Sequence, residues 1–352
     1  MKNIIAQFFN QTLDYQYAVF GSGNINDTYL LDIDDKKYIL QRINDAVFSN
    51  PIGVQQNILH LETHLENQSD YALEILKTLR TNDGESCYFD SNTNNYWRVF
   101  HYIDNNIAFD VVPNIDIAEK AAAAFGHYFR HLSDFDATLL HLSIPDFHNA
   151  SFRWQQYQDA LLQNKANRKE IIEKEITFIT DNQSIINEYE SVIATLPLRT
   201  IHYDTKINNV LFDKNTLFAK AVIDLDTTMP GYVTSDFGDL VRTATPNLNE
   251  DANPENVVLD IHLFEAITKG FLSETKSILT DSEKNALIYG GKLLIYIQAI
   301  RFLTDYLNGD TYYKIKYETH NFVRAQNQMA LLQSLLSQEY EMEKIVKLEL
   351  GK

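Results

Sequence analysis

The sequence has little cysteine and little positive charge, and both shortages restrict what the protein can be. Cys87 is the one cysteine among 352 residues, so no internal disulfide can form, and no Cys/His cluster has zinc spacing. Lysine and arginine number 30 against 48 aspartate and glutamate residues, which gives a formal net charge of -18. An acidic protein is not attracted to nucleic acid or to an anionic membrane. We therefore expect neither as a partner, and a bound anion needs a local basic group or a metal ion.

Long apolar runs are also scarce. No window of the sequence approaches the roughly 18 apolar residues of a membrane span, so we expect no membrane association. The stretch 1–9 is too short and too polar for a signal peptide. Together with the single thiol, these features predict a protein of the reducing cytoplasm. The sequence carries no signal for an oligomeric state.

The order of predicted elements indicates two lobes. With 352 residues, of which 45% are hydrophobic, the chain is too long for one compact core. Alternating and β-branched runs predict strands over 15–20, 28–33, 36–42, 86–90 and 96–102. Asn50-Pro51 predicts the start of one helix, which runs to about residue 68. Helical patterns dominate after Asp104, over 117–132, 168–196 and 316–347. The fold class is therefore α+β, with an antiparallel sheet lobe over 1–103 and a larger, mostly helical lobe over 104–352.

A glycine turn, Gly21-Ser22-Gly23, lies between the first two predicted strands. A dinucleotide-binding glycine motif opens a helix, but residues 28–33 are strand-like, so that interpretation fails. A glycine-rich hairpin can instead place its backbone N–H groups over phosphates, because glycine permits close approach. An ordinary hairpin turn remains the alternative.

The stretch 199–226 is the most informative part of the sequence. It contains His202-Tyr203-Asp204-Thr205-Lys206-Ile207-Asn208-Asn209, followed after a predicted strand by Asp224. Phosphoryl transfer requires a carboxylate for the acceptor hydroxyl, a cation near the transferring group and oxygen ligands for magnesium. Asp204 is the predicted base and Lys206 the γ-phosphate partner. Asn209 and Asp224 are the predicted Mg²⁺ ligands, because magnesium prefers such oxygen donors.

Two residues are candidates for holding the inner phosphates. Leu40-Gln41-Arg42 closes the third predicted strand, where a kinase with this order of strands places a basic residue, and the usual lysine is missing at that place. Arg42 is the nearest cation, and Gln41 takes the place if the register is shifted. The candidate for a helix glutamate that orients this cation is Glu62. We expect the nucleotide to contact Gly21, Ser22, Gly23 and Arg42, and also Tyr102 and Ile103, where the sheet lobe ends.

These motifs resemble the aminoglycoside phosphotransferase and choline kinase superfamily, which has the protein-kinase fold. More closely, the chain resembles the N-acetylhexosamine 1-kinase branch over nearly its whole length. The matching segments include Ile223-Asp224-Leu225-Asp226, and they cover residues 21–28, 38–44, 144–148, 202–212, 223–227, 236–239 and 301–310. The resemblance implies transfer of the ATP γ-phosphate to the anomeric hydroxyl of N-acetylglucosamine or N-acetylgalactosamine.

The resemblance also implies an acceptor site. Arg301 and Tyr312 resemble sugar-binding residues, and the glycine loop of residues 21–27 would face the sugar. Asn24 stands where the family often has histidine, so acceptor preference is expected to depend on it. Asp236-Phe237-Gly238 mimics the metal-binding triplet of protein kinases, but Asp224 already fills that place. We expect Asp236 to cap a helix that begins there and to brace the catalytic loop.

Two other functions remain open. A kinase of another hydroxyl acceptor, such as an aminoglycoside, choline or ethanolamine, uses the same catalytic residues. A catalytically silent pseudokinase would lack the base or a metal ligand, whereas Asp204, Asn209 and Asp224 are all present. The unusual Gln41-Arg42 pair is the one feature that favours a silent protein.

Overall fold

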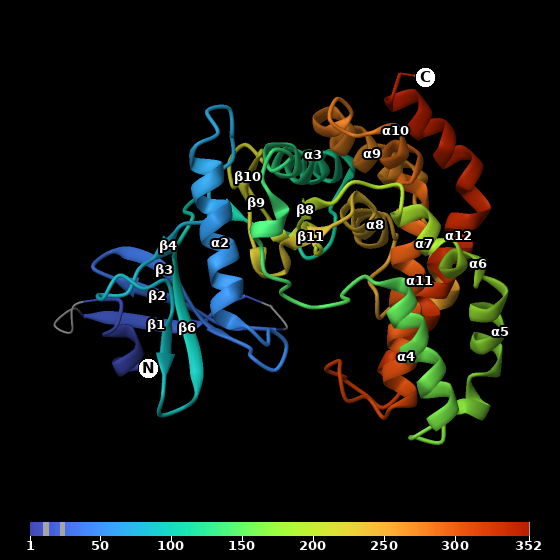
Figure 1. Ribbon diagram of the computed structural model, residues 1–352, viewed down its shortest axis with the longest axis horizontal. Coiled ribbons are helices and arrows are strands. Elements are labelled where there is room, and N and C mark those ends of the chain that lie inside the picture. Colours follow the sequence, from blue (N-terminus) through green and yellow to red (C-terminus); the bar gives the residue numbers. More distant parts are fainter. Residues whose placement is uncertain (10–13, 22–24, 352) are drawn as a thin grey trace. The chain divides into compact units, whose positions relative to one another are not determined.

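The computed structural model describes residues 1–9, 14–21 and 25–351 (Figure 1). The chain forms two compact units, each built from three separate segments. The first unit contains residues 1–107, 131–145 and 210–230, and the second contains 108–130, 146–209 and 231–352. The second unit is mostly helical, as the predicted α+β class requires.

An antiparallel sheet forms most of the first unit. Its strands pair in the order β1-β2-β3-β6-β4, and β5 also pairs with β6. Their bounds are β1 (Tyr15–Val19), β2 (Asp27–Ile33), β3 (Lys36–Ile43), β4 (Thr78–Leu79), β5 (Tyr88–Asp90) and β6 (Asn95–His101). The five predicted strands are confirmed within about two residues. The two-residue β4 has no alternation of its own, so the sequence pattern missed it.

The two faces of β3 carry different side chains. Leu40 belongs to a core with Ile4, Leu31 and Val99, which includes the short helix α1 (Lys2–Ile5). The neighbouring residue in the strand, Gln41, points to the opposite face, because successive strand side chains alternate. That face is the one covered by α2 (Pro51–Glu66), as the contact of its Gln55 with the sheet shows (Figure 1). The Asn50 side chain accepts the Gly53 N–H and starts α2, as predicted.

Short strands and 3₁₀ turns form the stretch 199–226. β9 (Val210–Asp213) pairs with β7 (Asn106–Ile107) and with β10 (Ala219–Val222) in the first unit. β8 (Arg199–Ile201) belongs to the second unit, and β11 (Met229–Gly231) ends where that unit resumes. The 3₁₀ helices are Ala137–Leu139, Lys169–Ile171, Ile207–Asn209, Leu225–Thr227 and Pro254–Asn256. The predicted break in the helical pattern over 199–226 is confirmed.

Within the described residues, ten helices follow β6 along the chain. They are α3 (Ile115–His131), α4 (Ala150–Gln163), α5 (Glu173–Asp181), α6 (Ser184–Asn187), α7 (Tyr189–Ile193), α8 (Val233–Ala244), α9 (Ile261–Thr275), α10 (Asp281–Asn285), α11 (Leu287–Leu307) and α12 (His320–Glu349). The prediction of one long helix over 168–196 was wrong, because three short helices stand there. Asn182 ends α5, and its side chain donates to the Phe178 carbonyl in competition with the backbone.

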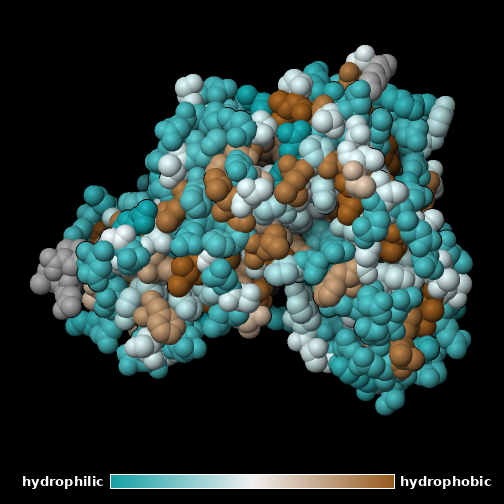
Figure 2. Space-filling view, viewed as in Figure 1, coloured by the Kyte–Doolittle hydropathy of each residue, from teal (hydrophilic) through white to brown (hydrophobic). Residues whose placement is uncertain are grey.

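Helix α11 is the core of the second unit and contacts α4, α8 and α12. By length and composition it could cross a membrane, so the expectation that no window comes near that limit was wrong. However, 83% of its apolar window is buried inside the protein, as in the core helix of a globular fold. On the face of the molecule in Figure 2, hydrophilic residues predominate and apolar ones lie in small separate groups.

Two glycines bring α8 and α11 into backbone contact. A Cβ atom on Gly238 would lie 2.4 Å from the Gly290 carbonyl oxygen, and one on Gly290 would lie 2.6 Å from that of Thr234. Only glycine fits at such a distance. The close contact places the polar residues of α8 beside those of α11.

Candidate active site

Three of the predicted catalytic residues lie together in the second unit. The Lys206 Nζ is 2.9 Å from Oδ2 of Asp204. The Asn209 amide donates to the same Oδ2, at 3.0 Å, and to the Asp204 main-chain oxygen, at 2.8 Å. These bonds fix the Asp204 carboxylate and leave Oδ1 of Asn209 as the amide atom that can face a cation.

The charge of Asp204 follows from these contacts. Burial acts to raise the pKa of this carboxyl group, but the Lys206 ammonium and the hydrogen bonds from Lys206 and Asn209 outweigh it. The pKa of Asp204 is therefore held below its ordinary value. At neutral pH the group is a carboxylate, as a base requires.

Asp236 holds the loop that presents Asp204. Its two carboxylate oxygens accept the main-chain N–H groups of His202, at 3.0 Å, and Tyr203, at 2.8 Å. The Thr205 hydroxyl donates to the Asp236 main-chain oxygen at 2.7 Å. The predicted brace is confirmed. The predicted cap is wrong, because α8 begins at Val233 and Asp236 lies inside its first turn, where its carboxylate serves another segment.

The brace keeps Tyr203 in an unfavourable backbone conformation. Its φ is +67°, in the left-handed region that bulky residues avoid at a cost of about 1–2 kcal/mol. Gly231 makes room for the ring, since a Cβ atom there would lie 2.1 Å from the Tyr203 hydroxyl. His202 is buried against Phe125 and accepts the Asp204 N–H at 3.3 Å, which fits the predicted structural role.

The second predicted magnesium ligand, Asp224, belongs to the first unit and follows β10. It has a left-handed backbone, with φ +61° and ψ +54°. In the described part of the chain no group of three or more His, Cys, Asp or Glu side chains is arranged to hold a metal. The donor types that these two residues offer, an amide oxygen from Asn209 and a carboxylate oxygen from Asp224, suit Mg²⁺, which takes much of its coordination from phosphates and water.

Most of the glycine turn lies outside the described residues. This holds for Ser22, Gly23 and Asn24, so their predicted contacts stay predictions. Gly21 has φ +77°, which suits glycine, and the Phe20 N–H donates to the Thr28 carbonyl at 2.9 Å, as in a hairpin.

The predicted phosphate-holding cation is not found where the sequence placed it. Arg42 forms an ion pair of 2.7 Å with Asp27 on the face of β3 opposite Gln41. Its Nη1 donates to Asn95, and Glu62 accepts the Thr78 N–H instead of orienting a cation.

A buried cation on the other face of the sheet is Arg98, which donates to Oε1 of Gln41 from β6. The sequence analysis missed Arg98, although an arginine between Trp97 and Val99 in an apolar strand was a signal. Tyr102 is half-buried and Ile103 is buried just after β6, and their nucleotide contacts stay predictions.

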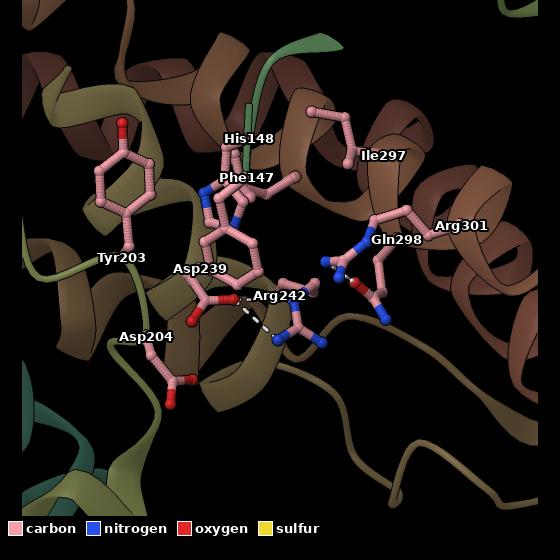
Figure 3. Close-up of a pocket in the computed structure, with 10 residues that line it drawn as sticks. Phe147, His148, Tyr203, Asp204, Asp239, Arg242, Ile297, Gln298 and Arg301 are labelled. Atoms are coloured by element: carbon pink, nitrogen blue, oxygen red, sulfur yellow. Dashed lines mark hydrogen bonds and ion pairs between the residues drawn. The ribbon is translucent and has the colours of Figure 1, made fainter. Parts of the chain in front are cut away.

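A pocket in the second unit opens beside Asp204 and contains about 300 Å³ of space, part of it open to solvent. Its wall from α11 consists of Leu294, Ile297, Gln298 and Arg301, which share one face of the helix. The other lining residues are Phe147, His148, Tyr203, Asp204, Asp239 and Arg242 (Figure 3).

Arg301 and Tyr312 come together, as predicted. The Arg301 guanidinium lies 5.8 Å from the Tyr312 ring centre and 5.2 Å from that of Phe147, and it donates to Gln298. Tyr312 is 59% exposed, so its ring can cover a ligand. The loop that carries Tyr312 is anchored by Asp305, whose carboxylate accepts the N–H groups of residues 311, 312 and 313.

Asp239 is a pocket residue to which the sequence analysis gave no role. Its Oδ1 accepts from Arg242 at 2.8 Å, and Arg242 in turn contacts Glu250. Within the described residues, its buried Oδ2 has no hydrogen-bond partner. Burial raises the pKa of Asp239 against the effect of Arg242. A buried carboxylate oxygen without a donor in a pocket wall is suited to accept a hydrogen bond from a ligand.

The profile of the phosphotransferase enzyme family matches residues 16–259. The chain belongs to this family. It is therefore a small-molecule phosphotransferase with a hydroxyl acceptor, and the superfamily predicted from the motifs is confirmed. The match does not name a branch within the family.

Solved structures with similar folds span almost the whole chain. An aminoglycoside phosphotransferase from Alicyclobacillus acidocaldarius has a TM-score of 0.67 at 13% identity, with 98% of this chain and 96% of that chain covered. A microcompartment-associated aminopropanol kinase has a TM-score of 0.69 at 17% identity, with 96% and 97% covered. A spectinomycin phosphotransferase in complex with ADP and spectinomycin has a TM-score of 0.56 at 12% identity, with 94% and 93% covered. The predicted bilobal kinase fold is confirmed.

Proposed function

We propose that the protein is an ATP- and magnesium-dependent kinase of N-acetylhexosamines, and that it phosphorylates the anomeric hydroxyl of N-acetylglucosamine or N-acetylgalactosamine. The observation that carries this proposal is the composition of the pocket beside Asp204. It offers the amide of Gln298, the planar donors of Arg301 and the unpaired carboxylate oxygen of Asp239. A sugar needs such donors and acceptors for its hydroxyls, together with an aromatic face for its ring.

The charges around the pocket favour a neutral acceptor over a cationic one. The negative charge of Asp204 is offset by Lys206, and that of Asp239 by Arg242. Arg301, in contrast, has no carboxylate partner in the described part of the chain. The pKa of His148, which lines the pocket, is affected by the positive charge around it. Burial, followed by the charges of Arg301, Arg242 and Arg153, holds its pKa well below the ordinary value. An amino alcohol or an aminoglycoside would bring a further cation into this field, at a cost in binding free energy.

The residues of the site have distinct roles in the proposed reaction. Asp204 accepts the proton of the anomeric hydroxyl while that oxygen forms a bond to the γ-phosphorus, and the bond from phosphorus to ADP breaks. Lys206 stabilises the charge on the transferring group. Asn209 and Asp224 would hold magnesium, whose charge would offset the negative charge of the phosphates. Arg301 and Tyr312 hold the sugar, so that the hydroxyl lies in line for attack.

The proposal extends to the lobes and the compartment. Residues 1–103, with Gly21, Ser22, Gly23, Tyr102 and Ile103, would contact the nucleotide, and residues 104–352 would carry the catalytic loop and the sugar site. Asn24 would influence the choice of acceptor. The free thiol of Cys87 and the supply of ATP both suit the cytoplasm.

The test is ADP release with ATP and Mg²⁺ over N-acetylglucosamine, N-acetylgalactosamine, glucose, galactose, choline and kanamycin, with Asp204→Asn as the blank. We expect turnover on one or both N-acetyl sugars, and phosphorus NMR of the product should place the phosphate on the anomeric oxygen. Turnover on choline or kanamycin alone would keep the phosphotransferase and overturn the sugar. No turnover on any acceptor, with ATP still bound, would support the pseudokinase.

A further inference from the structure

The guanidinium of Arg98 is buried in the first unit. Only 1% of the residue is exposed, and it lies in the middle of β6. Its Nη1 and Nη2 are each 2.7 Å from a carboxylate oxygen of Asp226, which is also 1% exposed. A two-point arginine–carboxylate pair in a core is geometrically demanding, and losing one partner leaves a buried charge.

Every nitrogen of Arg98 is committed to the protein. In addition to Asp226, its Nε and Nη2 donate to Oε1 of Gln41, at 3.0 and 2.7 Å, and its Nη1 points to Oε1 of Gln55 at 3.4 Å. Gln41 stands opposite Arg98 in the register of β3 and β6. The third strand therefore offers a neutral amide where a lysine was expected, and the cation of the neighbouring strand is bound by Asp226 and two glutamines. Arg98 has no donor left for a phosphate.

Asp226 connects Arg98 to the end of the glycine turn and to the segment of Asp224, both in the first unit. Its Oδ2 also accepts a hydrogen bond from Nδ2 of Asn26, at 2.6 Å. Oδ1 of Asn26 in turn accepts a hydrogen bond from the main-chain N–H of Asn44. Asn26 directly precedes β2, at the end of the glycine turn. Asp226 stands two residues after Asp224, in the 3₁₀ turn that follows the left-handed backbone of Asp224. One carboxylate thus links the glycine turn, β6 and the segment that carries a predicted metal ligand.

We propose that Arg98 and Asp226 are a positioning pair for the nucleotide site. Arg98 fixes the Asp226 carboxylate, and Asp226 fixes the backbone that aims Asp224 and the end of the glycine turn. The pair does in this chain what a lysine on the third strand would do by direct contact, but it acts through other residues. This inference rests on the phosphotransferase activity of the family and is independent of the identity of the acceptor.

Nucleotide binding tests the proposal without turnover. The dissociation constant of ADP is measured calorimetrically with Mg²⁺ and with EDTA in the wild type, Asp226→Asn, Arg98→Lys and Gln41→Met. Asp226→Asn preserves volume but weakens the pair. We expect Mg·ADP binding to weaken about tenfold or more, the usual loss when a residue that orients a metal ligand is changed, with a smaller loss in EDTA. Gln41→Met leaves the ion pair in place, so its loss should be smaller and in the same direction.

The matched control is Val99→Ala, which removes a buried side chain from the next position of β6, on the other face. It should lower the melting temperature and leave the affinity for Mg·ADP unchanged. If folded Asp226→Asn and Gln41→Met both bind Mg·ADP like the wild type, the pair is a structural element only and the proposal is overturned.

Discussion

The main-chain N–H of Tyr203 donates a 2.8 Å hydrogen bond to the carboxylate of Asp236, and this bond sets the conformation of the residue before Asp204, the proposed base. Burial raises the pKa of Asp236 to about 6, against the influence of His202 and of the two backbone donors. Both oxygens of the ionised group accept an N–H, so a proton on either one disturbs the loop. The titration of Asp236 therefore has opposite effects on activity and on stability.

For activity, we expect kcat at saturating substrates to fall as the pH falls through about 6. Asp236→Asn should lower kcat at neutral pH and abolish that acid limb. A pH profile between 5 and 8 measures both effects, with the product assayed as ADP. The same acid limb in Asp236→Asn would assign the titration to another group.

The pH dependence of stability has the opposite direction to that of kcat. The pKa of Asp236 is higher in the folded protein, about 6, than the ordinary 3.8, so its contribution is fully present below about pH 4 and is lost as the pH rises through 6. The shift corresponds to about 3 kcal/mol. The melting temperature of wild type relative to Asp236→Asn should therefore decline between pH 4.5 and 7. A constant difference would contradict the raised pKa.

Asp204→Asn should retain ATP binding and lose two or more orders of magnitude in kcat, in line with the typical contribution of about 10²–10⁴-fold from a general base. The amide preserves size but cannot take the proton, and Lys206 loses its carboxylate partner. Single-turnover rates and a calorimetric ATP titration separate the two effects. Near-normal turnover would remove Asp204 from its role.

Arg301→Ala should raise the KM of the sugar about tenfold or more and leave the KM of ATP nearly unchanged, because charged hydrogen bonds are typically worth about 1.5–3 kcal/mol. Arg301→Lys keeps the charge but loses the planar donors, so it should recover only part of the affinity. Initial rates over both substrates provide the comparison. Equal increases in the two KM values would point to a structural arginine.

Asp239→Asn tests the unpaired oxygen in the pocket. If Oδ2 accepts an acceptor hydroxyl, the variant should lose discrimination against the deoxy sugar that lacks this hydroxyl, by about tenfold or more in kcat/KM. A series of monodeoxy N-acetylglucosamines identifies the position, with melting temperature as the control for folding. Discrimination that is unchanged at every position would show that the oxygen serves the fold and not the substrate.

Local pattern was sufficient for the strands and for bringing Asp204, Lys206 and Asn209 together. The aromatic and β-branched residues of β2, β3 and β6 are typical of strands, and the spacing of Asp204, Lys206 and Asn209 reflects one short loop. Both are properties of neighbouring residues, which a sequence displays directly.

The missed features depend on partners far apart in the chain. Arg98 and Asp226 are 128 positions apart, and no local pattern pairs them. Arg42 and Gln41 were ambiguous for a related reason, since a one-residue shift in register exchanges the two faces of a strand. The role of Asp239 depends on α8 meeting α11 at Gly238 and Gly290, and neither glycine shows which helix it will contact.

The way the first unit draws on three separate segments has a consequence for its synthesis. Its last segment is 210–230, so nearly two thirds of the chain must leave the ribosome before that unit can be complete. Until then the nascent sheet lacks Asp226, and Arg98 has no counterion for its buried charge. We expect early strands to remain loosely folded during translation and to become fixed when Asp226 arrives. Nascent chains stalled before and after residue 226 should therefore differ sharply in their resistance to protease.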